Sequence, residues 1–237
     1  MSIRPLLMIG TSVLLLSACT MSSNSSSGVP LSELDLGGPP PDGVALAGAD
    51  RVQVIEGQTL SITMEGSDEA KQQMRFERED NMLVVSREGE GWNDSSEGAV
   101  TVTIIVPQLR HAVIGGSGQL DVARLSGDAT ATIGGAGTLA IEQIEASDLT
   151  VTIGGSGTVR GSGTAQDMTL SIGGSGDAEL DGLEVGSASV NIGGSGSARF
   201  ASDGEVNGNI AGSGDVRVTG DATCRQKSVG SGSLICG

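Results

Sequence analysis

Residues 150–180 read TVTIGGSGTVRGSGTAQDMTLSIGGSGDAEL and contain the motif Ile-Gly-Gly-Ser-Gly twice, beginning at Ile153 and at Ile172. The motif or a close variant recurs along the chain, beginning at Ile114, Ile133, Ile192 and Ile210, and Gly230-Ser231-Gly232 ends the series. Consecutive copies are separated by 18–20 residues. A regular period of this length is typical of solenoid proteins, in which each repeat forms one coil and stacks on its neighbours.

Polar and apolar residues alternate on both sides of each glycine motif. Thr150-Val151-Thr152-Ile153 leads into one copy, and Ala178 and Leu180 follow the next. A period of two residues predicts β-strands with one buried face. A third short strand in each repeat is indicated by Leu125, Ile144 and Leu183.

Equivalent positions one repeat apart stack when successive coils lie parallel, with their backbones paired at a spacing of about 4.8 Å. The glycine motif suits the corner between two strands, because glycine adopts a positive φ without a Cβ clash. We therefore predict an all-β fold, a single-stranded parallel β-helix over residues 111–237 with 18–20-residue coils and Gly-Ser-Gly corners. We expect a right-handed helix, because parallel crossovers are almost always right-handed.

Residues 44–110 contain strand patterns but no repeated glycine corner. Strands are predicted at 52–56, 59–64, 74–78, 82–87 and 100–106, with a helical turn from Asp68 to Gln73. Uncovered sheet edges promote aggregation. We expect this β-rich segment to begin the solenoid and to cap its first open edge.

The order of features from Leu46 to Gly237 resembles the head GIN domain family of bacterial secreted and lipidated proteins, whose name supposes an autotransporter adhesin. The matching marks are Val52-Gln53-Val54 with Gly57, Leu83-Val84-Val85 before an acidic turn, Val102–Val106 with Pro107-Gln108-Leu109, and corners at Gly174–Asp177 and Gly212–Asp215. This resemblance implies a right-handed β-helix and a location in the cell envelope. It supplies no catalytic motif.

Residues 1–18 have the form of an export signal. Arg4 precedes an apolar run from Leu6 to Leu16, which is shorter than the roughly 20 residues that a membrane-spanning helix needs. Leu16-Ser17-Ala18-Cys19 resembles the lipobox of bacterial lipoproteins. That resemblance implies cleavage before Cys19 and acylation of its thiol and amino group, which anchors the chain to a membrane. An ordinary secretory signal with an incidental cysteine is the alternative.

Residues 19–43 are predicted to be a disordered tether behind the lipidated cysteine. They include a serine-rich stretch, Ser22–Gly28, and the run Gly38-Pro39-Pro40-Pro41. Ser/Gly segments are flexible and proline runs are semi-rigid spacers. By the lipoprotein resemblance, Thr20 favours delivery to the outer membrane, with the periplasmic and surface-facing leaflets both left open.

The composition excludes several functions. The 237-residue chain has 29 acidic and 13 basic residues and a net charge of −16. Nucleic-acid binding requires a basic surface, so we expect no nucleic-acid partner. With 2 Phe, 1 Trp and no Tyr, the chain also lacks the rings for a carbohydrate site built on aromatic stacking.

We expect no catalytic residue, no cofactor and no metal. His111 is the only histidine, and no cysteine or acidic cluster flanks it at the spacing of zinc ligands. The chain has neither a P-loop nor a nucleophile elbow. Gly173–Asp177 differs from the calcium-binding nonapeptide repeat in period and in the position of its aspartate, although calcium at the acidic surface remains an alternative.

Cys224 and Cys236 lie roughly one coil apart at the end of the chain. In an exported protein such a pair usually forms a disulfide, which would close the last coil. Two free buried thiols are the alternative.

Arg160, Glu179 and Arg199 occupy the same position in consecutive coils. We predict a charge ladder along one face of the solenoid, which sets the register of the coils. A ligand groove at this position is the alternative.

The leading hypothesis is a non-enzymatic, envelope-anchored lipoprotein whose β-helical head serves adhesion or binds an unknown envelope or surface partner. A polysaccharide lyase or hydrolase that uses Asp177 and Glu179 is the alternative, although coils of 18–20 residues leave little room for active-site loops. A third hypothesis is an ice- or mineral-binding face built on Thr130, Thr132, Thr150 and Thr152.

Overall fold

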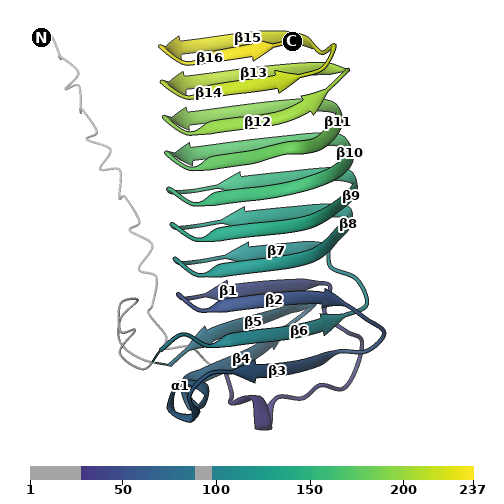
Figure 1. Cartoon of the computed structure of the whole chain (residues 1–237), viewed down its shortest axis with the longest axis vertical. Coiled ribbons are helices and arrows are strands. Elements are labelled where there is room, and N and C mark those ends of the chain that lie inside the picture. Colours follow the sequence, from purple (N-terminus) through teal and green to yellow (C-terminus); the bar gives the residue numbers. More distant parts are fainter. Residues whose placement is uncertain (1–27, 89–97) are drawn as a thin grey trace, which may run out of the picture.

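The computed structural model describes residues 28–88 and 98–237. Figure 1 shows an elongated stack of coils standing on a broader base. The sequence-based prediction of an all-β parallel solenoid with coils of about 19 residues is confirmed, and the stack has about seven turns.

Four long strands form the middle of the stack. They are β8 (Gln119–Ile133), β9 (Thr138–Ile153), β10 (Thr158–Gly174) and β11 (Asp177–Gly194), and each pairs in parallel with the next. Shorter strands complete the C-terminal coils: β12 (Ser197–Ser202), β13 (Glu205–Gly212), β14 (Asp215–Thr219), β15 (Thr223–Gly230) and β16 (Ser233–Cys236). All of these strands pair in parallel with the coil below.

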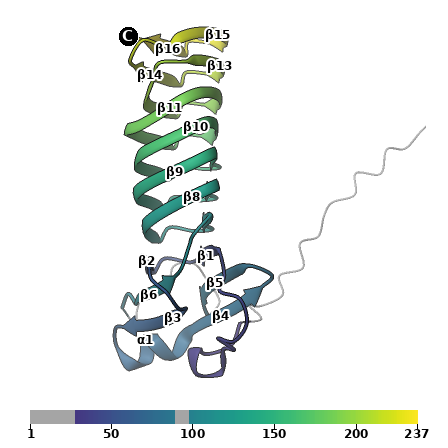
Figure 2. The same ribbon diagram turned by 90° about the vertical axis from the view of Figure 1, so that its right-hand side faces the viewer.

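Each coil is flattened, with two straight sides that meet at a sharp glycine corner and a rounded side opposite (Figure 2). The predicted third strand is part of the rounded side and is continuous with the other two, because β8 to β11 bend without breaking. Register shifts, such as the one between Gly161 and Gly163, accompany the bend. Leu125, Ile144 and Leu183 are buried there, as their apolar character predicts.

The interior is filled by stacked columns of aliphatic side chains. Ile133, Ile153, Ile172 and Ile192 are paired from coil to coil and are at most 2% exposed. Alternation in the sequence thus places one residue in two in the core and leaves its neighbour on the surface.

The base begins the solenoid, as predicted. Its strands are β1 (Gly43–Ala47), β2 (Arg51–Glu56), β3 (Ser61–Glu65), β4 (Met74–Glu79), β5 (Met82–Arg87), β6 (Thr101–Val106) and β7 (His111–Ile114). One straight side of the stack continues downward through β7, β1 and β5, and the other through β2 and β6. Antiparallel β4 and β3 end the two sides, and α1 (Asp68–Gln73) connects them. The helix is the helical turn that the sequence predicted, and Ser67 caps it by accepting from the Ala70 amide.

Residues 28–42 differ from the disordered tether that we expected. Val29 pairs with Phe76 of β4, and a 3₁₀ turn spans Leu31–Glu33. The Arg78 guanidinium donates to the carbonyls of Gly37 and Pro39, both at 2.6 Å. Main-chain pairing and these guanidinium contacts hold the segment against the base, so composition alone was a poor guide to it.

One buried ion pair stabilises the base. Asp50 is 4% exposed, accepts the Val100 amide at 3.0 Å and is bonded by two nitrogens of Arg87. Neither residue belongs to a recognisable sequence motif, and they come together only in the folded base.

Candidate binding face

The two straight sides of the solenoid carry different side chains on their outer surfaces. We call the first the neutral face, which consists of three outward columns of residues on β5, β1, β7, the C-terminal parts of β8–β11, and β13. We call the other the charged face, which consists of the outward residues of β2, the N-terminal parts of β8–β11, β12, β14 and β16. Both sides share one core and one strand spacing, so only the outward residues distinguish them.

The neutral face is organised in three outward columns that run along the stack. The first column is Met82, Gly43, His111, Thr130, Thr150, Thr169, Ser189 and Asn207. The second is Val84, Ala45, Val113, Thr132, Thr152, Ser171, Asn191 and Asn209. The third lies beside the corner and is Ser86, Ala47, Gly115, Gly134, Gly154, Gly173, Gly193 and Ala211. No Asp, Glu, Lys or Arg stands at these described positions, although the chain carries 29 acidic and 13 basic residues.

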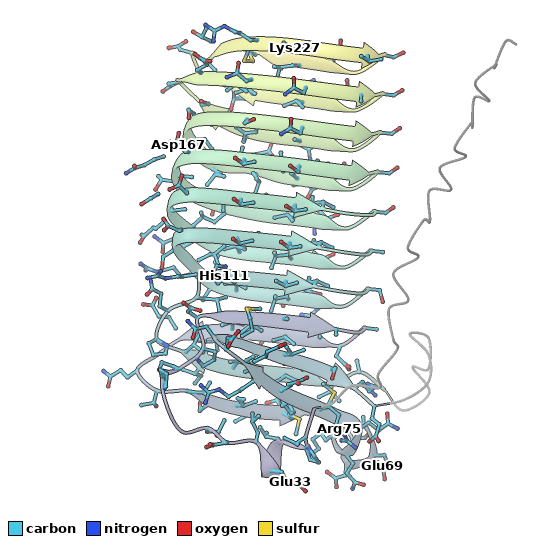
Figure 3. The ribbon with its side chains drawn as sticks, turned by 180° about the vertical axis from the view of Figure 1, so that it is seen from behind. Glu33, Glu69, Arg75, His111, Asp167 and Lys227 are labelled. Carbon is cyan, nitrogen blue, oxygen red and sulfur yellow. A yellow bond between two sulfur atoms is a disulfide. The ribbon has the colours of Figure 1, made fainter. Side chains whose placement is uncertain are left out.

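Figure 3 shows the neutral face, with Lys227 at its C-terminal end, His111 along it and Arg75 at the base. His111 is half-buried in β7 and belongs to the first column. The hydroxyl array seen in the sequence turns into amides at Asn191 and Asn209, whose side chains hydrogen-bond to each other at 3.1 Å. The surface changes from hydroxyl to amide without gaining charge.

The two consecutive glycines at the corner that ends β10, Gly173 and Gly174, have different reasons to be there. Gly174 has a φ of +145°, and a Cβ at this position would lie 2.3 Å from the Gly155 carbonyl oxygen. The backbone therefore requires glycine at position 174. At Gly173 a Cβ would meet no atom within 4 Å, and φ lies outside the left-handed region. The fold does not require this glycine, which keeps the neutral face free of a side chain.

A shallow groove of about 680 Å³ follows this glycine column. Its lining includes Thr152, Ser171 and Asn191 on one side and Gly154 and Gly173 along its floor. The groove continues to the last coil at Lys227 and Val229, and Val229 is 79% exposed.

Charges on the charged face pair with one another along the stack. Arg160 Nε lies 2.6 Å from Glu179 Oε2, and Arg199 Nη2 lies 3.5 Å from Glu179 Oε1. The three residues are in register in consecutive coils, where the sequence placed the ladder. A second column alternates Asp with Ser, and Ser197 Oγ donates to Asp177 at 2.5 Å. These charged and polar side chains thus have partners within the chain.

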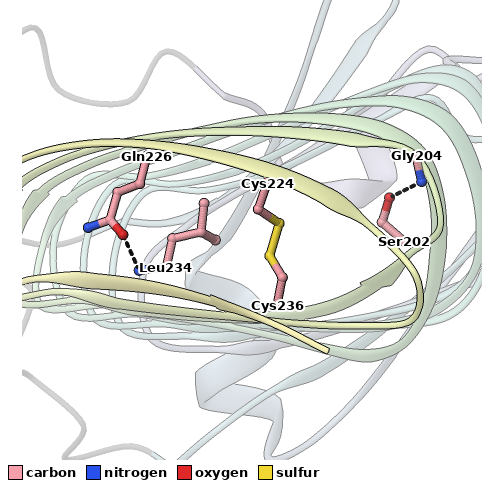
Figure 4. Close-up of a disulfide and its surroundings, with 6 residues drawn as sticks. All are labelled: Ser202, Gly204, Cys224, Gln226, Leu234 and Cys236. Atoms are coloured by element: carbon pink, nitrogen blue, oxygen red, sulfur yellow. Dashed lines mark hydrogen bonds between the residues drawn. A yellow bond between two sulfur atoms is a disulfide. The ribbon is translucent and has the colours of Figure 1, made fainter.

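The last coil is closed internally by a disulfide between Cys224 and Cys236, whose Cα atoms are 6.5 Å apart (Figure 4). Cys224 lies on β15 and Cys236 on β16, so the bond joins the two straight sides. Gln226 bridges the same two strands, accepting the Leu234 amide at 3.0 Å and donating to the Gly232 carbonyl at 3.1 Å. These contacts fill the end of the core. Nothing in the sequence indicated this role, because glutamine is a polar residue that is usually found on the surface.

Other predicted features lie elsewhere or have no counterpart in the described residues. Cys19 lies outside the described residues. Within residues 28–88 and 98–237, no group of three or more His, Cys, Asp or Glu is placed to hold a metal. Over the same ranges, no helix has the length and apolarity of a membrane span.

The family model described as "Putative auto-transporter adhesin, head GIN domain" matches residues 40–222. The chain belongs to the head GIN domain family. The resemblance drawn from the corner and strand motifs is thus confirmed. No curated protein shows significant similarity to this head GIN chain.

Solved structures share the fold of this head GIN chain. A "putative adhesin" from Bacteroides fragilis aligns with a TM-score of 0.71 and 20% identity, covering 83% of this chain and 93% of its own. A "putative lipid binding protein" from Parabacteroides distasonis aligns with a TM-score of 0.65 and 18% identity, covering 84% and 93%. A "putative adhesin" from Parabacteroides merdae aligns with a TM-score of 0.62 and 18% identity, covering 83% and 92%. At these identities the likeness establishes the fold.

Proposed function

We propose that this protein is a non-enzymatic, lipid-anchored component of the bacterial cell envelope whose solenoid head adheres to a partner through the neutral face. The observation that carries the proposal is the absence of charged residues from the three outward columns between β5 and β13 on a chain of net charge −16. The adhesin names of the family and of two solved structures agree with this function.

The two faces differ in what binding would cost. Removing water from a charged group costs far more free energy than removing it from a hydroxyl, an amide or a glycine backbone. A partner that covered the charged face would also compete with ion pairs such as Arg160–Glu179, which are already made. The neutral face offers a flat surface with hydroxyl and amide groups for hydrogen bonds and no charge to desolvate.

A lipid anchor is supported by Leu16-Ser17-Ala18-Cys19, with Thr20 favouring the outer membrane. Each buried CH₂ of an acyl chain contributes about 0.8 kcal/mol, so two or more chains hold a protein stably. Val29 pairs with β4 of the base, so the chain enters the head at the end farthest from β15 and β16. An anchored head would therefore stand with its base toward the membrane.

Non-enzymatic action is supported by the engagement of the candidate catalytic carboxylates. Asp177 accepts a hydrogen bond from Ser197, and Glu179 lies between Arg160 and Arg199. A general acid or nucleophile needs a carboxylate that can reach substrate. These two are used to join coils.

The experiment compares lysine substitutions on the two faces of the same coils. Thr152→Lys with Ser171→Lys places two cations on the neutral face, and Thr138→Lys with Thr158→Lys places two on the charged face as the matched control. Cells producing each variant are tested for adherence to one another and to a mucin-coated surface. We expect loss of adherence only for the neutral-face pair. Equal adherence of all three proteins would contradict the proposal.

Location and anchoring are tested separately. Protease added to intact cells should cleave the head, and cleavage only after lysis would place the head in the periplasm and contradict adhesion to external partners. Radioactive palmitate should label the natural chain and should not label Cys19→Ser.

A further inference from the structure

We propose that the partner of the neutral face is a second copy of this chain, packed face to face with its solenoid axis antiparallel. The inference rests on the proposed function, since it names the partner of the same face. Three observations carry it: opposite charges at the two ends of the face, their matching positions along the strands, and the area of the face.

The neutral face is bounded by charges of opposite sign. At the base, Glu77 and Glu79 of β4 pair across the strands with Val84 and Met82 of β5. At the other end, Arg225 and Lys227 of β15 pair with Asn207 and Asn209 of β13. Arg75 of β4 stands at the base of the third column, where its guanidinium pairs with Glu88. The first and second columns are therefore acidic at the base, uncharged along their length and basic at the last coil.

The charges also share columns. Glu79 and Arg225 continue the first outward column, and Glu77 and Lys227 continue the second. A twofold axis lying in the face and parallel to the strands keeps each column opposite itself and reverses the order of the strands. Such an axis brings Lys227 of one copy opposite Glu77 of the other, and the same contact forms again at the other end.

The alternative parallel arrangement is disfavoured by the same charges. If the two solenoid axes pointed the same way, β15 would face β15 and β4 would face β4. Lys227 of one copy would then lie near Lys227 of the other, and Glu77 near Glu77. Like charges in an interface oppose association, whereas opposite charges set the register of two surfaces. The end charges thus select the antiparallel pair.

The face has the area of a stable interface. From β4 to β15 it contains ten strands, which at about 4.8 Å per step gives a length of about 43 Å. The three columns span about 15 Å along the strands, including their side chains. Each copy would bury about 650 Å², and the pair about 1,300 Å², within the roughly 1,200–2,000 Å² of specific interfaces.

The outward glycines favour close approach. Gly154 and Gly173 would face the same column of the second copy, where no side chain separates the two backbones. The nearest acidic residues, such as Asp148 and Asp167, follow the rounded side of the coil, where Figure 3 places Asp167 at the margin of the face. They would border the contact and remain in solvent.

An antiparallel pair places the two bases at opposite ends. Because each chain enters its head at the base, the two anchors would leave the pair in opposite directions. Two copies on apposed envelopes would meet in this way, whereas two copies anchored side by side would present their faces in the parallel arrangement. The structure thus points to self-association between cells.

The first test uses charge reversal on the full chain with Cys19→Ser, studied by sedimentation equilibrium. Lys227→Glu and Glu77→Lys should each weaken the dimer about tenfold or more, because each replaces two opposite-charge contacts by like-charge contacts. The double variant restores both contacts and should dimerise like the parent. Glu184→Lys, on the rounded side, is the control and should leave the dimer unchanged. Failure of the double variant to recover would overturn the antiparallel register.

The second test uses cysteine cross-linking and keeps native charge. The twofold axis passes between β8 and β9, so Thr152 of one copy lies opposite Thr132 of the other. A short bismaleimide should therefore join two copies of Thr152→Cys, while Ala140→Cys, on the charged face of the same strand, should stay monomeric. The test uses the chain with Cys19→Ser, in which the two remaining native cysteines, Cys224 and Cys236, are paired with each other and do not react.

The outcomes separate this inference from the proposed function. A chain that is monomeric at all concentrations, with neutral-face lysines still abolishing adherence to mucin, would overturn self-association and leave adhesion standing. If neutral-face substitutions changed neither adherence nor dimerisation, both the self-association and the proposed adhesive role of this face would be overturned. Dimerisation with cross-linking through Thr152→Cys and charge-swap recovery would support the antiparallel pair.

Discussion

The neutral face and the charged face are built from the same coils, yet they teach different things about the sequence. Both have a strand spacing set by the backbone and an aliphatic column on the inside. On the charged face, outward residues complement their neighbours one coil away, as Glu179 does between Arg160 and Arg199. On the neutral face, the three outward columns contain no charged residue from β5 to β13. The inward residues build the core, so core packing does not account for the absence of charge from the three columns of the neutral face.

The largest expected effect is a difference in stability between substitutions at two adjacent glycines: Gly174, which the fold requires, and Gly173, which belongs to the neutral face. Gly174→Ala should destabilise the protein by about 3 kcal/mol or more, because alanine is strained at φ +145° and its Cβ would overlap the Gly155 carbonyl. Gly173→Ala should change stability by less than about 0.5 kcal/mol or add slightly to it, because alanine has less unfolded-state entropy. Urea unfolding of the two variants measures the difference. Similar losses of stability for the two variants would mean that the backbone conformation also requires the glycine of the neutral face.

The second prediction concerns the bond that joins the two faces in the last coil. Cys224→Ser with Cys236→Ser should destabilise the terminal coil by about 2–3 kcal/mol, as the chain-entropy model gives for a loop of this size. Since a solenoid unfolds locally from its ends, the loss should appear as faster hydrogen exchange in β15 and β16. Exchange in β9 should be unchanged and serves as the internal control. Uniformly faster exchange would show that the disulfide supports the whole stack.

The third prediction tests whether charge matters only on the charged face. Glu179→Lys places four cations in consecutive coils, together with Arg160, Arg199 and Arg217. It should cost about 1 kcal/mol at low salt, with much of the loss recovered in 1 M NaCl. Thr152→Lys introduces the same cation among uncharged neighbours and should cost less than about 0.5 kcal/mol. Thermal unfolding at both salt concentrations measures the two costs. A larger loss for Thr152→Lys would assign the neutral face a role in folding.

Sequence periodicity predicted the solenoid because every coil repeats the same physical requirement. Each repeat contains an inward Ile and a corner glycine. Both can be recognised in the sequence because they return at the same position in successive repeats. The base was predicted less well. Asp50 and Arg87 are 37 residues apart and carry no local pattern, so their buried ion pair emerges only from the fold.

Similarly, the composition of residues 28–42 resembles a tether, but Arg78 binds their carbonyls from another strand. The neutral face was visible in the sequence only in part. Thr150 and Thr152 stood out as part of a hydroxyl array, whereas Asn191 and Asn209 were not recognised as belonging to the same surface. Only the register of the strands showed that the hydroxyls, amides and glycines form three continuous columns, none of which contains a charged residue.

The smallest expected effect lies where the neutral face meets its basic end. A hydrogen bond from Asn207, followed by the contacts with Arg225, lowers the pKa of the Glu205 carboxyl below its ordinary value. A carboxyl with a lowered pKa in the folded state stabilises that state above its unfolded pKa of about 4.3. This contribution disappears as the pH falls through the lowered folded value and the carboxyl becomes protonated. Glu205→Gln should therefore be slightly less stable than the parent at pH 7 and equal to it at pH 2 to 3.

Urea unfolding at the two pH values measures this difference, and Glu184→Gln, for which no partner is expected, is the control. Glu205 also pairs with Arg225, a residue of the proposed interface. Removing the carboxylate leaves Arg225 without its partner in the same chain and makes it more available to Glu79 of a second copy. Glu205→Gln should thus lower stability and strengthen the dimer at pH 7. A weaker dimer would mean that Glu205 holds Arg225 in the position that the second copy requires.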